Sequence, residues 1–318
     1  MSTTQRPRIG IIGTGAIGGF YGLMLARAGF DVHFLLRSEY SAVATNGLQL
    51  NSAVHGPLAL HPVQAYKNAE DMPRCDWLLV GAKTSSNASL VPAITRAAAD
   101  GAKVLLLQNG LAVEDELRPL LPANLHLLGG LCLICVHRAA AGVIEHQALG
   151  TVNIGYHSGP ATAEERQQIT ADGAAMFNVA GVDAMAATEL AEARWKKLVW
   201  NVPYNGLSVL LNAGTTALMG DLNSRALIAS IMGEVVAGAA ACGYQIPADF
   251  AAKMLKATER MPDYLPSMYH DHKHRRPLEL HAIYAAPLAA ATAAGCSMPR
   301  IEALYQALQF IDQRNTQN

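Results

Sequence analysis

The stretch from Arg8 to Arg37 constrains the fold of this chain more strongly than any other part of the sequence. It begins with the apolar run at 9–12, which is short and rich in β-branched residues, as in a buried parallel strand. Three glycines in G-x-G-x-x-G spacing follow, then an apolar helical segment that ends at Gly29, and then a second apolar run at 32–36. Strand, glycines, helix and strand in this order, within about 30 residues, predict a dinucleotide-binding βαβ unit.

Each of the three glycines has a separate task in such a unit. Gly13 permits the tight turn out of the strand, Gly15 lets the backbone approach a pyrophosphate, and Gly18 lets the helix pack closely on the sheet. The helix then presents free N–H groups and partial positive charge to the phosphates. A glycine-rich turn that binds nothing is the alternative. The residues expected to bind the cofactor here are Gly13, Thr14, Gly15, Ala16, Ile17 and Gly18.

The end of the second apolar run indicates which dinucleotide the unit takes. A site that prefers NAD usually has Asp or Glu there, where the carboxylate bonds the ribose hydroxyls. This chain has Arg37 and Ser38 instead, and its next acid is Glu39. A guanidinium suits a 2′-phosphate, whereas a carboxylate would repel it. The sequence therefore favours NADP (NADPH) over NAD, and the alternative is that Arg37 is a solvated charge at a strand end.

Length and composition narrow the class of protein. A chain of 318 residues with 51% hydrophobic and 15% charged residues suggests a globular protein of about two domains. The net charge of −1 argues against nucleic acid or an anionic membrane surface as a partner. The start of the chain is polar and shows no signal-peptide pattern. The 5 cysteines, an odd number mostly within apolar runs, fit a reduced, cytoplasmic protein.

Two further buried strands are expected to end in polar residues. The run at 76–80 leads to Lys83, and the run at 103–107 leads to the pair Asn109-Gly110. In a doubly wound sheet the ligand lies outside the carboxyl ends of the parallel strands. Lys83 and Asn109 are therefore candidates for the rim of the cofactor site, with ordinary turn chemistry as the alternative.

The remaining pattern predicts an α/β fold in which a Rossmann-type doubly wound sheet is followed by an all-helical domain. The composition becomes alanine-rich near residue 187, so we expect a dinucleotide-binding domain at 1–187 and a helical substrate-binding domain at 188–318. The uncharged segment 282–298 is interrupted by a proline and a glycine, which predicts a buried helix and not a membrane span. The other elements expected in the first domain are strands near 48–50, 58–60, 127–136, 142–145, 151–154 and 182–184, and helices at 88–99, near 113–121 and at 164–180.

One helix of the second domain is expected to have a polar face. Lys197, Asn201 and Asn205 recur at every fourth position, and Ser208 and Asn212 roughly prolong the row. The other faces of this helix are apolar, so the polar groups need hydrogen-bond partners inside the protein or on a ligand. The alternatives are another helix of the same domain and a small polar substrate in a cleft between the domains.

A later segment supplies matching polar groups. Pro277 suits the first position of a helix, which places Glu279 in the opening turn of the last long helix. A helix N-terminus that faces the cleft would suit a substrate carboxylate. The alternating histidines of 270–274 include a lysine and match no metal-ligand motif, so we expect a solvated basic loop there and no metal site.

With these groups of residues in view, the sequence resembles the ketopantoate reductase family (2-dehydropantoate 2-reductases) over nearly its whole length. The resemblance implies an N-terminal Rossmann domain, a helical C-terminal domain, and reduction of 2-dehydropantoate to pantoate with NADPH, on the path to pantothenate and coenzyme A. It rests on GTGAIG at 13–18, Arg37, Lys83, Asn109-Gly110, Lys197-Leu198, Asn201, Asn205, Ser267-Met268, Asp271, Arg276 and Glu279.

The resemblance also implies roles for individual residues. Lys197 would be the proton donor, and Glu279 would contact the substrate hydroxyl or the cofactor ribose. The substrate, a small 2-oxo acid, would be held by Asn201, Asn205 and Ser267. Elementary chemistry agrees, because an ammonium beside a ketone stabilises the negative charge that develops on oxygen when hydride arrives, and then delivers the proton.

Two positions depart from the family pattern. Tyr264 stands where many relatives present an asparagine to the substrate, and Thr215 is a second such position. Both bear on what the pocket accepts, so another branched 2-oxo acid or a β-hydroxy acid is an alternative substrate. A non-enzymatic dinucleotide sensor is an alternative function. The alanine- and leucine-rich helices of the second domain are compatible with a homodimer face or with an internal core.

Overall fold

The computed structural model describes residues 6–317, with side chains described for 6–315. Contacts within the chain divide the described residues into two compact units. The first contains the described residues up to Gln108 together with Val113–Leu190. The second contains the loop Asn109–Ala112 and the described residues from Ala191 onward. A short loop that directly follows a strand of the first unit therefore packs as part of the second.

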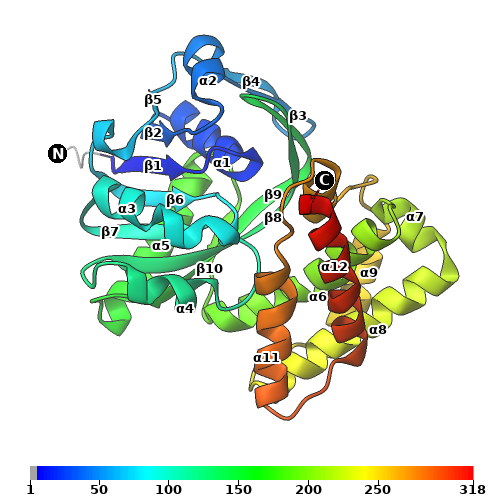
Figure 1. The fold of residues 1–318 in the computed structure, drawn as a ribbon. Helices are drawn as coiled ribbons and strands as arrows, with labels where there is room; N and C mark the ends of the chain where they lie inside the picture. Colours follow the sequence, from blue (N-terminus) through cyan, green and yellow to red (C-terminus); the bar gives the residue numbers. More distant parts are fainter. Residues whose placement is uncertain (1–5, 318) are drawn as a thin grey trace. The chain divides into compact units, whose positions relative to one another are not determined.

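The first unit is built on one 10-stranded sheet whose central part is parallel. Its strands are β1 (Arg8–Ile12), β2 (Asp31–Leu35), β3 (Leu48–Ser52), β4 (Gly56–Leu60), β5 (Ala65–Tyr66), β6 (Cys75–Val80), β7 (Ala98–Leu106), β8 (His126–Ala140), β9 (Val143–Ser158) and β10 (Ala184–Ala186). The order is β4-β3-β9-β8-β7-β6-β1-β2-β5, with β10 paired to β9. The run from β8 to β5 is parallel throughout, so the strands next to β1 end at one edge of the sheet (Figure 1).

The βαβ unit predicted from the glycine spacing is confirmed. α1 (Ala16–Arg27) follows β1 and precedes β2, as expected. Phe20 and Tyr21 of α1 are fully buried in the same core as Ile11 of β1 and Phe34 of β2. The helix ends before Gly29, whose φ of +83° is a left-handed conformation that favours glycine.

Helices and 3₁₀ turns connect the other strands of the first unit. They are α2 (Tyr40–Asn46), α3 (Asn87–Ala97), α4 (Val113–Leu117), α5 (Ala163–Val179), η1 (Ala69–Asp71), η2 (Thr84–Ser86) and η3 (Arg118–Leu120). α5 begins with a capping box, in which Thr162 and Glu165 each accept a hydrogen bond from the other's backbone N–H. The helix expected near 113–121 is shorter, because a 3₁₀ turn replaces its end and Leu121, before a proline, is extended.

The long antiparallel pair β8–β9 differs from the sequence prediction. Separate strands at 142–145 and 151–154 are predicted, and this is wrong, because β9 runs unbroken from Val143 to Ser158. Leu149, with a φ of +66°, lies inside β9, and the β8–β9 register shifts close to it. Bulges of this kind let a strand continue through residues that resemble a turn in the sequence.

The second unit is helical, as predicted, and its core surrounds α6. Its helices are α6 (Leu190–Leu210), α7 (Thr215–Gly220), α8 (Leu222–Ala241), α9 (Phe250–Thr258), α10 (Ser267–Lys273), the π-helical turn η4 (His281–Ala285), α11 (Ala286–Ala293) and α12 (Pro299–Gln317). Trp195 and Tyr204 of α6 are fully buried together with Tyr284 of η4. The Tyr284 hydroxyl donates to the carbonyl of Val202, 2.8 Å away, just before the proline that α6 carries at position 203.

Two predictions about the extent of helices in the second unit are wrong: one helix is shorter than predicted, and another replaces a predicted loop. Asn212 lies beyond the end of α6 and has a φ of +51°, so it does not prolong the polar face of that helix. The histidine-rich segment is not a loop, because α10 runs through it to Lys273. The buried Asp271 carboxylate of α10 pairs with Arg276, 3.0 Å away, across the turn where Arg275 has a φ of +52°.

The position of Glu279 also differs from the prediction. It lies in a segment without regular secondary structure between α10 and η4, whereas the last long helix is α12. Pro277 is not helical, and the next N–H, that of Leu278, donates to Asp312 of α12 at 2.9 Å. The carbonyl of Glu279 accepts from the Ile283 N–H at 3.4 Å, so Glu279 immediately precedes the helical segment.

α8 is the one helix within residues 6–317 that is long and apolar enough to cross a membrane by length and composition. Its residues Ile228, Ile231 and Met232 are buried in the core of the second unit. Its Glu234 carboxylate accepts hydrogen bonds from the backbone N–H groups of Arg300 and Ile301, at the start of α12. These contacts are those of a core helix that also caps a neighbouring helix.

Candidate active site

The carboxyl ends of the central strands gather the candidate cofactor residues of the first unit. The Gly81 N–H, which follows β6, donates to the carbonyl of Ile12 at the end of β1. The Thr14 hydroxyl of the glycine turn donates to the carbonyl of Leu35 at the end of β2, 3.3 Å away. The structure therefore brings the glycine turn, the segment leading to Lys83, and the segment leading to Arg37 to one edge of the sheet.

The three glycines of the turn have different surroundings. Gly13 has a φ of +86°, and a Cβ there would lie 2.5 Å from the backbone nitrogen of Ala82. A Cβ on Gly18 would lie 2.3 Å from the Gly13 carbonyl oxygen. A Cβ on Gly15 would meet nothing within 4 Å, so the space beside this residue is open. The turn is thus packed against the protein at its ends and open in the middle.

The start of α1 suits an anion for electrostatic reasons. Its N-cap residue is Gly15, no side chain caps it, and its first turn contains no acidic residue. The first N–H groups of a helix lack intrahelical acceptors and carry partial positive charge. The residues present therefore fit the diphosphate of a dinucleotide.

A polar pair that the sequence does not reveal holds the backbone just before Lys83. The Gln108 side-chain nitrogen donates to the Ala82 carbonyl at 2.8 Å and to the Asn87 amide oxygen at 2.6 Å. The Asn87 amide nitrogen donates back to Gln108 at 3.1 Å, and both side chains are buried. A glutamine at the end of a buried strand was the available signal. This pair fixes the turn from β6 to η2, and the half-buried Lys83 is the N-cap residue of η2.

Of the charged residues just after β2, the cation is exposed and the anion is buried. Arg37 is exposed, whereas Glu39 is 7% exposed. The Glu39 carboxylate accepts a hydrogen bond from the Gly142 N–H at 3.0 Å and forms an ion pair with Arg138. The first acid after β2 is therefore already paired inside the protein.

Asn109 lies in the second unit, near Glu279. The Leu111 N–H donates to the carbonyl of Ala282 in η4 at 2.8 Å. Gly110 has a φ of +108°, and a Cβ there would lie 2.4 Å from the Ala282 Cβ. The loop that carries Asn109 therefore packs on the turn that immediately follows Glu279, whose side chain is buried.

The polar face of α6 is only partly satisfied within the protein. The Asn205 amide nitrogen donates to the Asn201 carbonyl at 3.0 Å, and its oxygen accepts from the Met268 N–H at 3.3 Å. The Ser208 hydroxyl donates to the Asn205 carbonyl at 3.0 Å. The Asn201 amide nitrogen is buried and has no hydrogen-bond partner among the described residues. Asn205 and Ser208 have partners in their own unit, as the first alternative expects. A substrate as the partner of the Asn201 amide nitrogen stays a prediction.

Lys197 and Ser267 lie close to Asn201 and Asn205 in the fold. Lys197 is half-buried one helical turn before Asn201, on the same face of α6. Ser267 begins α10 and adjoins Met268, the residue that Asn205 holds. The second unit thus has Lys197, Asn201 and Asn205 on one face of α6, and Asn205 joins this face to the start of α10, where Ser267 lies.

Tyr264 and Thr215, the two departures from the family pattern, bond to each other. The Tyr264 N–H donates to the Thr215 hydroxyl at 2.9 Å, and the Thr215 N–H donates to the Tyr264 carbonyl at 3.0 Å. The Tyr264 ring is buried, 6.2 Å from that of Trp200 on α6. Their pairing anchors the start of α7 to the segment before α10. Their effect on substrate choice stays a prediction.

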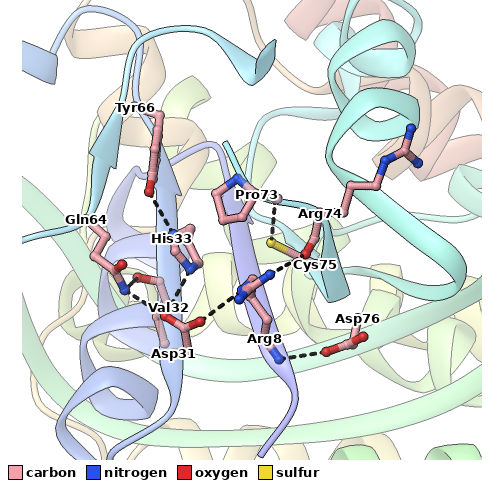
Figure 2. Close-up of polar contacts among 10 residues, drawn as sticks. All are labelled: Arg8, Asp31, Val32, His33, Gln64, Tyr66, Pro73, Arg74, Cys75 and Asp76. Carbon is pink, nitrogen blue, oxygen red and sulfur yellow. Dashed lines mark hydrogen bonds and ion pairs between the residues drawn. The ribbon is translucent and has the colours of Figure 1, made fainter. Parts of the chain in front are cut away.

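A second polar network lies at the opposite edge of the sheet from the glycine turn (Figure 2). Arg8 and Asp31 begin β1 and β2, and Arg8 Nε lies 2.9 Å from Asp31 Oδ2. Asp31 Oδ1 lies 2.9 Å from His33 Nε2 and accepts a hydrogen bond from Gln64. His33 Nδ1 lies 3.0 Å from the hydroxyl of Tyr66. This network ties the first residues of β1 and β2 to β5 and is not part of the candidate site.

The pKa shifts in this network follow from hydrogen bonding and burial. The hydrogen bond from Gln64, with those from Arg8 and His33, lowers the pKa of Asp31 to about 2. Burial lowers the pKa of His33 and raises that of the neighbouring Cys75 to about 12. Within residues 6–317 no group of three His, Cys, Asp or Glu side chains is placed to hold a metal ion.

The chain is similar to known proteins over nearly its whole length. A family model described as "Ketopantoate reductase PanE/ApbA" matches residues 9–159, and one described as "Ketopantoate reductase PanE/ApbA C terminal" matches residues 189–312. A 2-dehydropantoate 2-reductase of Nostoc sp. is 43% identical over 309 residues, which cover 96% of this chain and 95% of that protein.

Solved structures give the same result. The crystal structure of 2-dehydropantoate 2-reductase from Geobacter metallireducens GS-15 matches with a TM-score of 0.88 and 38% identity, covering 96% of this chain and 99% of that one. The enzyme of the same name from Methylococcus capsulatus matches with a TM-score of 0.83 and 32% identity, covering 97% and 98%. The similarity thus extends through both units.

Proposed function

Because the chain belongs to the ketopantoate reductase family, oxidoreductases that reduce 2-dehydropantoate to pantoate with NADPH, we propose that it catalyses this reaction. The first unit would bind NADPH through the glycine turn, Lys83 and Arg37. The second would bind the 2-oxo acid and supply the proton. The cysteines at 75, 132, 135, 242 and 296 are all free thiols, which supports a reducing compartment, and we place the enzyme in the cytoplasm.

The half-buried Lys197 is the proposed proton donor. Bound NADPH would supply the hydride that reaches the 2-oxo carbon. The ammonium of Lys197 would stabilise the negative charge on the carbonyl oxygen and transfer its proton there, leaving an alcohol. Glu279, buried beside the loop that carries Asn109, would contact the new hydroxyl or the cofactor ribose.

The single observation that carries the substrate site is the unpaired amide nitrogen of Asn201. A buried N–H donor without an acceptor costs free energy, so folded proteins rarely keep one without a use. Asn201 lies one turn from Lys197 and next to Asn205, whose carbonyl and amide are already engaged. A carboxylate or carbonyl oxygen of a 2-oxo acid is the acceptor that this donor would take.

The proposal is tested by following the absorbance of NADPH during steady-state turnover. The panel contains 2-dehydropantoate and other branched 2-oxo acids, each with NADPH and with NADH. We expect the highest kcat/KM with 2-dehydropantoate and NADPH. A higher kcat/KM with another acid would identify that acid as the substrate, which the departures at Tyr264 and Thr215 would then explain. Tight NADPH binding without turnover of any acid would contradict the enzyme proposal and favour a sensor.

A further inference from the structure

We propose that the ion pair between Arg138 and Glu39 sets the preference for a 2′-phosphorylated dinucleotide, by neutralising the carboxylate nearest to Arg37. The inference rests on the proposed function in one respect, namely that the dinucleotide binds at the glycine turn. It concerns two residues that lie outside the glycine turn and the polar face of α6. It makes Arg138 a specificity-determining residue that acts through Glu39.

Glu39 stands where a carboxylate would change the choice of cofactor. It is the first acid after β2 and lies two residues beyond Arg37. Sites that select NAD use an acid in this region to bond the ribose hydroxyls, and the same charge repels a 2′-phosphate. The Thr14 bond to the Leu35 carbonyl keeps the end of β2 beside the glycine turn, so this region is close to the expected ribose.

The structure commits the Glu39 carboxylate to other partners. Its Oε2 accepts from the Gly142 N–H at 3.0 Å, and its Oε1 pairs with an Arg138 guanidinium nitrogen. The Glu39 side chain is 9% exposed and that of Arg138 is 37% exposed. Its backbone is also held, because the Glu39 carbonyl accepts from the Val43 N–H in the first turn of α2.

The partners of Glu39 come from the tip of the β8–β9 hairpin, which packs against the end of α2 and the start of β3. Gly142 lies in the tip with a φ of +75°, and a Cβ there would lie 3.0 Å from the carbonyl of Gly47, at the end of α2. The Gly142 carbonyl accepts from the Gln49 N–H at 2.8 Å. The hairpin tip therefore holds Glu39 by one neutral donor and one cation, and only the cation cancels its charge.

Removing Arg138 should therefore add one negative charge beside the 2′-phosphate site. The probes are 2′-phospho-ADP-ribose and ADP-ribose, which differ by that phosphate alone, and the readout is the Kd from titration calorimetry. In Arg138→Met we expect the Kd for 2′-phospho-ADP-ribose to rise about tenfold at low salt, and less at high salt. The Kd for ADP-ribose should stay within about twofold, because that ligand lacks the repelled phosphate.

The double variant separates charge from structural damage. Glu39→Gln in the Arg138→Met background removes the uncompensated carboxylate, and we expect the Kd for 2′-phospho-ADP-ribose to return to within about threefold of wild type. If both Kd values rise together in Arg138→Met, the pair is only structural and the proposal is wrong. If the double variant stays weak for the phosphorylated ligand alone, Arg138 binds the phosphate itself, which also overturns the proposal.

Arg37→Ala tests the proposed function separately. Loss of affinity for 2′-phospho-ADP-ribose in this variant, with no effect of Arg138→Met, would leave the cofactor site standing and reject the role of the ion pair. If wild type binds neither probe, the proposed dinucleotide site itself fails. The predicted pattern is selective weakening in both single variants and recovery only in the double variant.

Discussion

At the scale of residues, Lys197 and Lys196 are adjacent lysines with different surroundings. Lys196 forms an ion pair with Glu192 on α6, whereas Lys197 lies on the face that carries Asn201. We predict that Lys197→Ala lowers kcat by about 100-fold or more, because the proton donor is lost, while the Kd of NADPH stays nearly unchanged. Lys196→Ala is the matched control and should keep kcat. Equal turnover in Lys197→Ala and wild type would reject the proton-donor role.

A second experiment should distinguish the role of Asn201 in substrate binding from the role of Asn205 in stability. The Asn201 amide nitrogen makes no hydrogen bond among the described residues, so Asn201→Ala should raise the substrate KM about tenfold without lowering the Tm. Asn205→Ala breaks bonds to the Asn201 carbonyl and the Met268 N–H, and should destabilise the fold by about 1–2 kcal/mol. Thermal unfolding and steady-state kinetics measure both. A Tm that falls equally in the two variants would contradict this division.

The sequence predicts which residues share a helical face better than it predicts what each of them bonds to. The spacing of Lys197, Asn201 and Asn205 placed them on one helical face, and the structure confirms that face. The spacing could not tell which amide is already bonded, because the partner of Asn205 lies far along the chain, at Met268. Likewise nothing local to Glu39 indicates that Arg138 neutralises it.

At the scale of elements, the geometry of the turn from β1 to α1 predicts different outcomes for alanine substitutions at two of its glycines. Gly15→Ala adds a methyl group into open space, so the protein should keep its Tm while the Kd of NADPH rises about tenfold or more. Gly18→Ala forces a methyl group to 2.3 Å from the Gly13 carbonyl, so its Tm should fall. Thermal unfolding and a binding titration test the pair. A Gly15→Ala variant with wild-type NADPH affinity would remove the turn from the cofactor site.

The buried histidines of the sheet predict acid sensitivity. Burial lowers the pKa of His33 in β2 and of His146 in β9. Unfolded histidine titrates near about 6.5, so below that pH the unfolded chain binds more protons than the folded one, and stability falls. Asp31 adds no pH dependence in this range, because its carboxylate, with a folded pKa of about 2, is ionised in both states.

The measurement is the Tm between about pH 8 and pH 5.5 at constant ionic strength. We expect a decrease of a few degrees, roughly what 1 kcal/mol produces in a unit of this size. Below about pH 4 the contribution of Asp31 should be lost as well, since its unfolded pKa is then crossed. A Tm that is flat or rises on acidification to pH 5.5 would contradict the burial argument.

Elements with one strong period were predictable, and those shaped by distant contacts were not. The apolar runs predicted β1, β2 and β6 to within one residue, whereas β7 begins at Ala98, five residues before the predicted run at 103–107. The sequence predicts two strands in place of β9, because the bulged part near Leu149 has the local composition of a turn. It predicts a loop in place of α10, because periodicity does not reveal the pair of buried Asp271 with Arg276.

At the scale of the whole molecule, the loop Asn109–Ala112 follows a strand of the first unit but packs in the second, and a prediction follows from that packing. A methyl group on Gly110 would meet the Ala282 Cβ at 2.4 Å, in addition to the strain of its φ of +108°. We predict that Gly110→Ala lowers the Tm by several degrees more than Gly243→Ala, whose φ of +88° is similarly strained but whose surroundings are open. Equal losses would mean that the packing of the loop on η4 contributes nothing.

The order of the two structural classes was predictable from composition, because alternating strands and helices give way to alanine-rich helices. The assignment of Asn109–Ala112 to the helical unit was not, because a four-residue contact with η4 leaves no periodic signal. A homodimer stays a prediction that light scattering would test.

The most direct test of the proposed reaction follows the hydride from NADPH to the product. The enzyme is incubated with 2-dehydropantoate and NADPH that carries deuterium at both C4 positions of the nicotinamide ring, and the pantoate is analysed by mass spectrometry and NMR. We expect one deuterium per molecule, located at C2, with a rate that Lys197→Ala lowers by about 100-fold. Pantoate without deuterium at C2, or NADPH that is bound but never oxidised, would contradict it.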